Sequence, residues 1–306
     1  MKYAVISDIH GNFPAFRAVL ADAEAHGANA YLLLGDYASS FPWGNDVVTA
    51  IRGLKNAVAI AGNGETYFSG LTPDSDFTHE QFKPVYWSYR ELSRENLEYL
   101  AALPETATIR KIHLHHSMSL FYRANRIEIF HSGPFREMMS AQIFSRDEYR
   151  ARAREALLSR PDVIAEIAAL PDGVYLFGHN HLQFHTQIDG KLFVNPGSCG
   201  EQLDWETTAA YTLLTCDGND TIVTERRVRY DIHAVAAELD ASEFTAYAPV
   251  WSKIMKAELL SGIDYFGIFV KHLYETGRAM GFCETPVRNE VWDAALKTWE
   301  VGNGKI

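Results

Sequence analysis

Short apolar segments alternate with amphipathic ones over the first 63 residues, and this alternation constrains the fold more than any other feature of the chain. The segments "YAVIS", "AYLLLGD" and "AVAIAGN" have the length and apolar character of buried strands. Between them lie two predicted helices, "PAFRAVLADAEAHG" and "GNDVVTAIRGL", with Pro14 and Gly27 marking the ends of the first. The βαβαβ order predicts a parallel sheet covered by helices.

Polar side chains follow each of these predicted strands. Asp8 and His10 follow the first, Asp36 the second and Asn63 the third, at spacings of 28 (36 − 8) and 27 (63 − 36) residues. A βαβ unit takes roughly 30 residues, so each polar group falls at the carboxyl end of a successive strand. Open α/β sheets build their sites at that edge.

Further histidines extend this set. "YLFGHNHLQF" places His179 and His181 two residues apart after an apolar run, and His131 ends "RIEIFH". Imidazole and carboxylate groups suit first-row transition metals. The seven candidate ligands exceed the needs of one metal and suit two, about 3.5–4 Å apart, with Asp36 as the bridge. They are Asp8, His10, Asp36, Asn63, His131, His179 and His181. Three glycines beside them allow sharp turns and close backbone approach: Gly35, Gly62 and Gly178.

The rest of the chain continues as a mixture of strands and helices. Residues 66–104 form an aromatic-rich excursion that ends in a helix, 106–131 a predicted β-hairpin, and 154–170 a helix. Residues 182–198 predict a hairpin with its turn at Asp189-Gly190, and 209–230 predict another strand pair. After about residue 231 the pattern is helical. We therefore expect a domain at 1–232 and a helical extension at 233–306.

Composition narrows the class of protein. The net charge of −11 and the absence of a Lys/Arg-rich run disfavour nucleic acid or an anionic membrane as partner. No apolar stretch reaches the roughly 18 residues of a membrane span. Three cysteines without a CxxC pair favour a reducing compartment, and we expect a cytoplasmic protein.

Five segments together resemble the calcineurin-like metallophosphoesterase family, in particular its small bacterial and archaeal phosphodiesterase-like branch. They are "SDIHGN", "LLLGDYASSFPWGNDVV", "AIAGNGE", "LFGHNHLQF" and "LFVNPGSCG". The resemblance covers roughly residues 1–232. It implies a four-layer αββα sandwich, here with a C-terminal helical extension.

The resemblance also implies roles for individual residues. One divalent metal would be held by Asp8, His10 and His181, the other by Asn63, His131 and His179, and Asp36 would bridge them. Asp36 and Asn63 would thus take part in catalysis. A metal-bound hydroxide would attack a phosphodiester or a small nucleotide-like phosphate compound. The two metals would be Mn, Ni, Fe or Zn.

The chain departs from the family pattern at two points. Gly64 stands where many members have a histidine that helps to protonate the leaving group, so the general acid is unassigned. The fourth motif is best matched by "IFHSGP", which favours His131 as ligand, while the earlier "HLHH" offers His115 and His116 as the alternative. Its alternation predicts two solvent-facing rings on a strand.

Five more residues are candidates for binding substrate, four of them with a structural alternative. The backbone near Asn12 would position the phosphate. Phe41 and Trp43 would stack on an aromatic leaving group, or pack beneath a loop. Glu65 would support a ligand histidine, or cap a helix. Arg136 would meet a substrate phosphate, or form a surface ion pair.

Two alternatives concern the whole chain. The first is a non-catalytic scaffold of the same fold that binds protein partners; the intact ligand set favours the enzyme. The second concerns residues 233–306, which would serve as a lid, as packing helices or as a homodimer contact, given aromatic residues such as Trp251 and Phe266.

Overall fold

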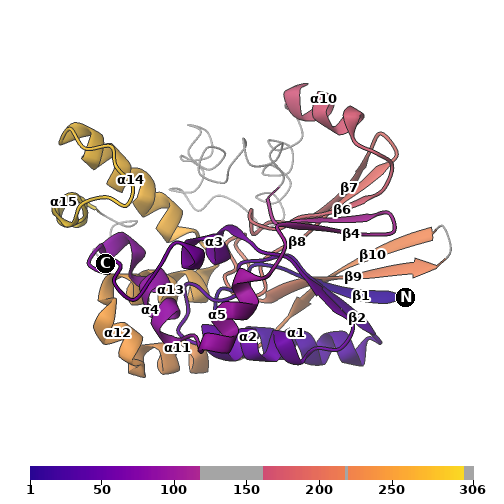
Figure 1. The fold of residues 1–306 in the computed structure, drawn as a ribbon, viewed down its shortest axis with the longest axis horizontal. Helices are drawn as coiled ribbons and strands as arrows, with labels where there is room; N and C mark the ends of the chain where they lie inside the picture. The colour runs from indigo at the N-terminus through magenta and orange to yellow at the C-terminus, as the bar shows by residue number, and fades with distance from the viewer. Residues whose placement is uncertain (118–160, 218–219, 300–306) are drawn as a thin grey trace.

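Two β-sheets form the centre of the computed structural model, which describes residues 1–117, 161–217 and 220–299 (Figure 1). In spatial order, the first sheet contains β10 (Asp220–Val228), β9 (Ala209–Asp217), β1 (Lys2–Ile6), β2 (Ala30–Leu33) and β3 (Ala57–Ala59). Strands β1, β2 and β3 run parallel, as the βαβαβ pattern predicts. Strand β9 pairs antiparallel with both β1 and β10.

The second sheet mixes parallel and antiparallel pairs. In spatial order it contains β4 (Thr106–Ile109), β5 (Ile112–His115), β6 (Val174–Leu176), β8 (Lys191–Pro196) and β7 (Gln183–Ile188). Strands β5, β6 and β8 run parallel, and the hairpins β4–β5 and β7–β8 form its two edges. The β7–β8 turn has left-handed backbone at Asp189 (φ 49°) and Gly190 (φ 74°), which agrees with the predicted Asp-Gly hairpin.

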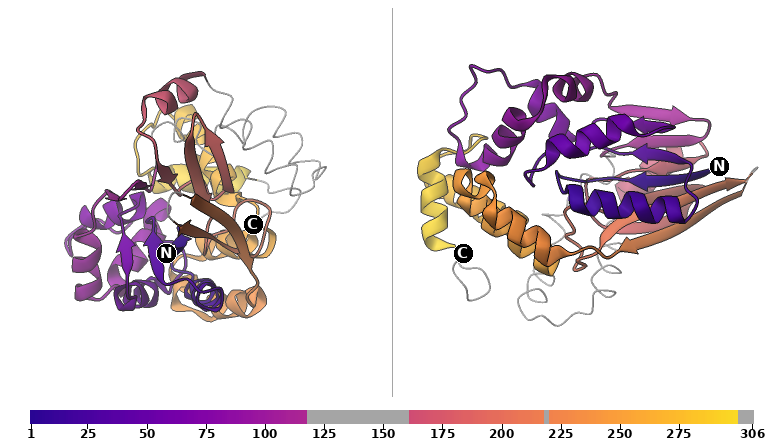
Figure 2. Two further views of the ribbon diagram at one scale, coloured as in Figure 1. Left: turned by 90° about the vertical axis from the view of Figure 1, so that its right-hand side faces the viewer. Right: turned by 90° about the horizontal axis from the view of Figure 1, so that it is seen from below.

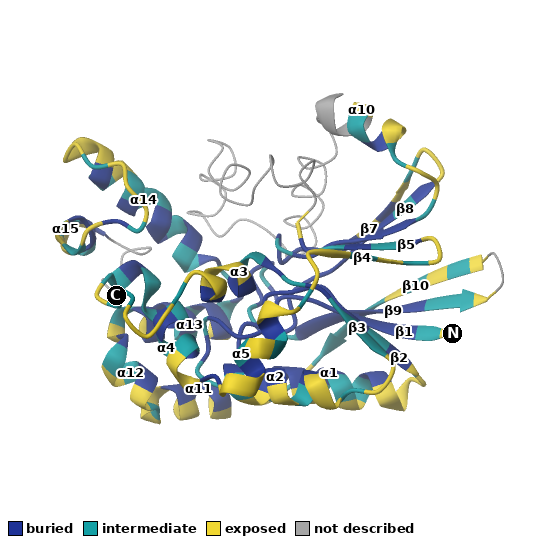
Figure 3. Cartoon of the chain, viewed as in Figure 1, coloured by how far each residue is buried: buried dark blue, intermediate teal, exposed yellow. Residues whose placement is uncertain are grey.

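Helices cover the outer faces of the two sheets. The first sheet is covered by α1 (Phe13–Ala25), α2 (Gly44–Gly53), α4 (Lys83–Glu91) and α5 (Arg94–Ala101), whose apolar residues join one core with the strands. Beyond the second sheet lies α10 (Pro161–Ala169), as Figures 1 and 2 show. Between the sheets, aliphatic side chains such as Val5, Leu32, Leu114 and Leu176 form a second core. The inner strands β1, β6 and β8 are accordingly buried through most of their length, whereas the edge strands β4 and β10 are not (Figure 3). This arrangement confirms the predicted αββα sandwich.

Two shorter elements connect the first sheet to the rest of the chain. Helix α3 (Asn63–Ser69) begins directly after β3, and the 3₁₀ turn η1 (Glu80–Phe82) precedes α4. Helix α3 runs into the aromatic-rich excursion of the sequence, and η1 lies within it. They bring aromatic side chains to the same end of the molecule as the carboxyl ends of the parallel strands.

The C-terminal part is helical, as predicted, and contributes a third core. Its helices are α11 (Ile232–Ala241), α12 (Glu243–Tyr247), α13 (Pro249–Ser261), α14 (Tyr265–Ala279) and α15 (Asn289–Thr298). They gather at one end of the sheets, in orange and yellow in Figure 2. Their core includes Trp292 and Phe244, together with Phe41 from the loop after β2. Within the described ranges, no helix is long and apolar enough to cross a membrane.

Candidate metal centre

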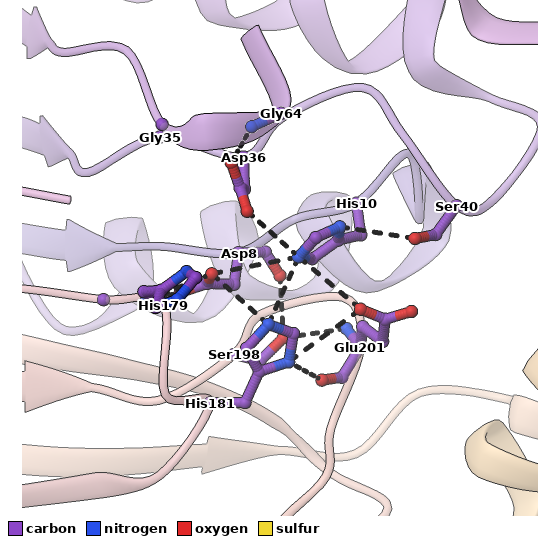
Figure 4. Close-up of polar contacts among 12 residues, drawn as sticks. Asp8, His10, Gly35, Asp36, Ser40, Gly64, His179, His181, Ser198 and Glu201 are labelled. Carbon is purple, nitrogen blue, oxygen red and sulfur yellow. Dashed lines mark hydrogen bonds and ion pairs between the residues drawn. The ribbon is translucent and has the colours of Figure 1, made fainter. Parts of the chain in front are cut away.

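The candidate ligands lie just beyond the carboxyl ends of strands from both sheets. Asp8 and His10 follow β1, and Asp36 follows β2. From the second sheet, His179 and His181 follow β6. The facing sheets thus bring residues that are some 170 positions apart into one cluster, in which their side chains converge (Figure 4).

The first group consists of Asp8, His10 and His181, all of them buried. The Nε2 atoms of His10 and His181 lie 3.2 Å apart, and Asp8 Oδ1 lies 3.4 Å from His181 Nε2 and 3.8 Å from His10 Nε2. One ligand atom from each residue therefore faces a common point. This is the set that the family resemblance implies for one metal.

The second group consists of Asp36, His116 and His179. His116 Nε2 lies 3.0 Å from Asn63 Oδ1 and 3.4 Å from Asp36 Oδ2. The rings of His116 and His179 meet edge to face, with their centroids 5.3 Å apart. Asn63 thus adds a fourth candidate ligand to this group.

Asp36 lies between the two groups. Its Oδ2 atom is 3.4 Å from His116 Nε2 in the second group and 3.7 Å from His10 Nε2 in the first. Its other oxygen, Oδ1, accepts a hydrogen bond of 2.7 Å from the Gly64 backbone N–H. The carboxylate is therefore fixed with one oxygen directed at both sets of histidines, which is the position that a bridging ligand needs.

The donor chemistry fits divalent cations. His181 Nδ1 donates to the backbone oxygen of Glu201 at 2.6 Å, and His116 Nδ1 donates to that of Leu34 at 2.7 Å. Each bond fixes the ring and leaves Nε2 directed at the carboxylates, the usual arrangement of a ligating histidine. Nitrogen and carboxylate donors in this ratio suit first-row transition metals.

Without metal, protons on the histidines balance the negative charge of the neighbouring carboxylates. Burial lowers the pKa of His10, but the negative charges of Glu201 and Asp8 outweigh it and raise that pKa to about 9. For His116, burial is likewise outweighed by Asp36, and the pKa rises to about 10. Burial raises the pKa of Asp36, but its histidine neighbours bring the net value below its ordinary one. The cluster thus stabilises positive charge at its centre.

The backbone at the candidate ligands is left-handed, a conformation that side-chain-bearing residues seldom adopt. The φ angles are 53° at Asp8, 50° at His10, 56° at Asp36, 67° at His179 and 56° at His181. Such strain costs of order 1–3 kcal/mol per residue and concentrates at functional sites. Five strained positions in one cluster therefore favour a functional role.

Glycines let the backbone close around these ligands. A Cβ on Gly62 would lie 2.3 Å from Asp36 Oδ1, and one on Gly178 would lie 2.6 Å from Asp8 Oδ2 and 1.9 Å from Ser7 Oγ. All three distances are far inside van der Waals contact. Any side chain at these positions would displace a candidate ligand, which is the close approach that the sequence predicted.

Glu65 positions the Asp36 loop. Its Oε2 atom accepts hydrogen bonds from the N–H groups of Asp36 (2.9 Å) and Gly62 (2.7 Å), and Oε1 accepts from Tyr37 N–H (2.9 Å). The bond to Gly62 also caps the first turn of α3. Of the two sequence-based alternatives for Glu65, the structure shows the helix cap.

For the fourth histidine, the structure places the alternative, His116, in the second group. His131 lies outside the described residues, as does Arg136, whereas His116 joins the second group. The predicted hairpin over 106–131 is formed by β4 and β5 within residues 106–115, so a strand ends at His115 and its next residue enters the site. His113 and His115 lie on the face of β5 opposite to its buried residues, and both rings stack near Tyr175. Only those two rings follow the predicted alternation.

Three of the residues that the sequence proposed for substrate binding have structural partners elsewhere. Phe41 is 1% exposed and belongs to the C-terminal core, with Trp43 stacked beside it at 6.2 Å. Packing, the alternative left open for both, is what the structure shows. The Asn12 side chain caps α1 and donates to the backbone oxygen of Gly200 at 2.8 Å, so it holds a loop of the site in place.

Sequence reasoning missed Glu201. Its Oε2 atom lies 3.5 Å from His10 Nε2, and its side chain is 14% exposed. The preceding "NPGS" turn carries it there, since Ser198 Oγ donates to the Asp8 backbone oxygen at 2.7 Å. A polar residue after such a turn has no distinctive spacing, and the only signal for it was its place directly after the family-like segment "LFVNPGSCG".

Comparison with known proteins agrees with this geometry. The sequence model of the calcineurin-like phosphoesterase superfamily domain matches residues 1–219. Over 244 residues the chain is 25% identical to the uncharacterized protein MJ0912 of Methanocaldococcus jannaschii, a match that covers 75% of this chain and 88% of that protein. The family motifs therefore lie in the part of the chain that carries the cluster.

Solved structures share the fold. The metallophosphoesterase from Sphaerobacter thermophilus has a TM-score of 0.62 and 19% identity, and the match covers 86% of this chain and 100% of that one. The hypothetical protein PH1004 from Pyrococcus horikoshii OT3 has a TM-score of 0.57 and 17% identity, over 83% and 97% of the two chains.

Proposed function

The chain belongs to the calcineurin-like phosphoesterase superfamily, and from this we propose that it is a phosphoesterase that uses two divalent metal ions to hydrolyse phosphodiesters or small nucleotide-like phosphate compounds. The position of Asp36 carries the proposal. Its Oδ2 atom contacts a histidine of each group, at 3.4 Å and 3.7 Å, so the two candidate metal sites share a ligand. Shared carboxylates are what closely spaced metal pairs require.

Each metal would have its own set of ligands, and one residue would be shared. Asp8, His10 and His181 would hold one metal, Asn63, His116 and His179 the other, and Asp36 both. When bound, such a pair of cations supplies positive charge to the phosphoryl oxygens and acidifies water at the site. The protein contributes a rigid frame, because the backbone carbonyls fix the rings of His116 and His181 and Gly64 fixes Asp36.

Gly64 has a structural function where many relatives carry a histidine. Its N–H holds Asp36 Oδ1, and a Cβ at this position would lie 3.0 Å from that oxygen. With no side chain here to protonate the leaving group, substrates with a good leaving group would react fastest.

Hydrolysis of bis(p-nitrophenyl) phosphate and of p-nitrophenyl phosphate, with manganese or nickel added in turn, tests the proposal. We expect turnover with at least one metal, its loss on chelation, and its loss in Asp36→Asn. Asp172→Asn, an exposed carboxylate change away from the site, serves as the matched control. If neither ester is hydrolysed by protein that holds two metals per chain, the enzyme proposal is wrong and the scaffold alternative is favoured.

A further inference from the structure

A cleft with a volume of about 340 Å³ adjoins the two candidate metal groups. On one side it is lined by candidate ligands that include Asp36, Asn63 and His179. On the other side it is lined by residues of α13 and α14, which lie beyond the segment that the family model matches. The volume falls within the range of small-molecule sites, roughly 300–1,000 Å³. The cleft therefore has room for more of a substrate than its phosphate.

The wall formed by the C-terminal helices is aromatic. Trp251 of α13 and Phe266 of α14 have ring centroids 4.3 Å apart, and Tyr274 lies two turns further along α14. Trp251 is 7% exposed, and its Nε1 donates to the backbone oxygen of Glu80 at 2.8 Å. The indole is thus held in one orientation before any ligand arrives.

The facing wall is aromatic as well, and it is attached to a candidate ligand. Asn63 and Tyr67 are four residues apart on α3, so they lie on the same face of that helix, and both line the cleft. Tyr67 is 45% exposed and meets the ring of Phe82 edge to face, at 5.5 Å and 88°. An aromatic ring therefore stands one helical turn from a residue that would hold metal.

Hydrogen bonds join the two walls. Gln81 Nε2 donates to Tyr274 Oη at 3.0 Å, and Gln81 Oε1 accepts from the Val287 N–H at 2.8 Å. Gln81 is itself buried. The turn η1 is thereby fixed to the C-terminal helices, and the cleft keeps its width without a ligand. A preformed site of this kind loses little entropy when it binds.

We propose that this cleft is a subsite for a flat aromatic ring in the alcohol part of the phosphate ester, as in an aryl or a nucleoside ester. The inference rests on the proposed function, since the metals would place the phosphate. Five aromatic side chains surround the space: Tyr67, Phe82, Trp251, Phe266 and Tyr274. Aromatic rings in offset-stacked or edge-to-face contact attract one another beyond the gain from buried area, which favours a planar aromatic guest over an aliphatic one of equal bulk.

Calorimetric titration of the manganese-loaded full chain with three phosphonates tests this proposal without turnover. Phenylphosphonate, cyclohexylphosphonate and methylphosphonate carry the same anionic head and differ in the group that would enter the cleft. We expect phenylphosphonate to bind roughly 10-fold more tightly than methylphosphonate and more tightly than cyclohexylphosphonate.

Two variants test whether the cleft causes the preference for phenylphosphonate, and a third serves as the control. Tyr67→Leu and Phe266→Leu should each bring the phenyl-to-methyl affinity ratio towards one and leave methylphosphonate binding unchanged. Tyr31→Leu, on the first sheet and outside the cleft lining, should keep the wild-type ratio. Equal affinity for all three phosphonates, or a ratio that both cleft variants keep, would overturn the subsite, even in a preparation that hydrolyses phosphodiesters. An inactive protein that shows the phenyl preference would overturn the enzyme proposal and leave the subsite standing.

Discussion

Removing the carboxylate of Glu65 should destabilise the metal-free protein strongly. Glu65→Ala leaves three buried N–H groups, those of Asp36, Tyr37 and Gly62, without the acceptor they have at 2.7–2.9 Å. An orphaned buried donor costs about 1–3 kcal/mol, so three donors set a range of roughly 3–9 kcal/mol. Typical total stabilities are roughly 5–15 kcal/mol, so this one change would remove a large part of the free energy of unfolding.

Glu65→Gln keeps the size of the side chain but changes its hydrogen bonds, so it distinguishes the loss of a hydrogen bond from the loss of the side chain. Its amide oxygen can take the place of Oε2, which accepts two of the three bonds, while its NH₂ group would face the Tyr37 N–H. We expect it to lose about 1–3 kcal/mol, the cost of one orphaned donor. The order of stability should therefore be wild type, then Gln, then Ala.

Urea unfolding in the presence of a chelator measures these differences without a contribution from bound metal. Glu91→Ala, an exposed change on α4, provides the control and should stay within about 0.5 kcal/mol of wild type. A Glu65→Ala protein that loses less than about 1 kcal/mol would refute the reasoning, because the three N–H groups would then have found other partners.

Three further predictions concern the metal groups. His116→Ala should bind about one metal fewer per chain than wild type, whereas His115→Ala should keep the full number, as measured by plasma mass spectrometry. Asp36→Ala should lose more metal than His10→Ala, since Asp36 contacts both groups; a fully loaded Asp36→Ala protein would contradict the bridge. The raised pKa values of His116 (about 10) and His10 (about 9) give the metal-free protein a stability contribution that is complete below their ordinary pKa of about 6.5 and is lost as the pH rises to 9–10. Its thermal midpoint should fall over that range, and less so in His116→Ala; equal falls in the two proteins would count against the assignment.

The parallel strands and the polar residues after them could be predicted because their signals are local. A short apolar run followed by glycine and a polar residue marks a strand end, and such ends placed Asp8, Asp36 and Asn63 at one edge of a sheet. His116 was only the alternative to His131, because "IFHSGP" matched the family motif better and the alternation of "HLHH" predicted solvent-facing rings on a strand; β5 in fact ends at His115, one residue before it. Strand length is set by pairing with β6, which comes some 60 residues later in the chain, and the hairpin sequence does not encode that limit.

The placement of Phe41 depends on information that no local pattern holds. It follows a candidate ligand in a loop, so exposure and stacking on a substrate were reasonable expectations. Its actual neighbours belong to helices some 200 residues further along the chain. The same distance kept open the role of Trp251 and Phe266, for which the sequence offered a lid, packing helices or a dimer contact. Their place in the cleft lining follows only once α13 and α14 are positioned beside α3.

The burial of Phe41 among the C-terminal helices also bears on how such proteins can be recombined. The loop that carries Asp36 enters, five residues later at Phe41, a core that the family-matching segment does not build for itself. A chimaera that joins residues 1–232 to the C-terminal helices of another relative would need helices that bury this phenylalanine in the same way. Replacement helices that do not bury Phe41 would shift the loop that positions Asp36, although Phe41 itself does not line the cleft.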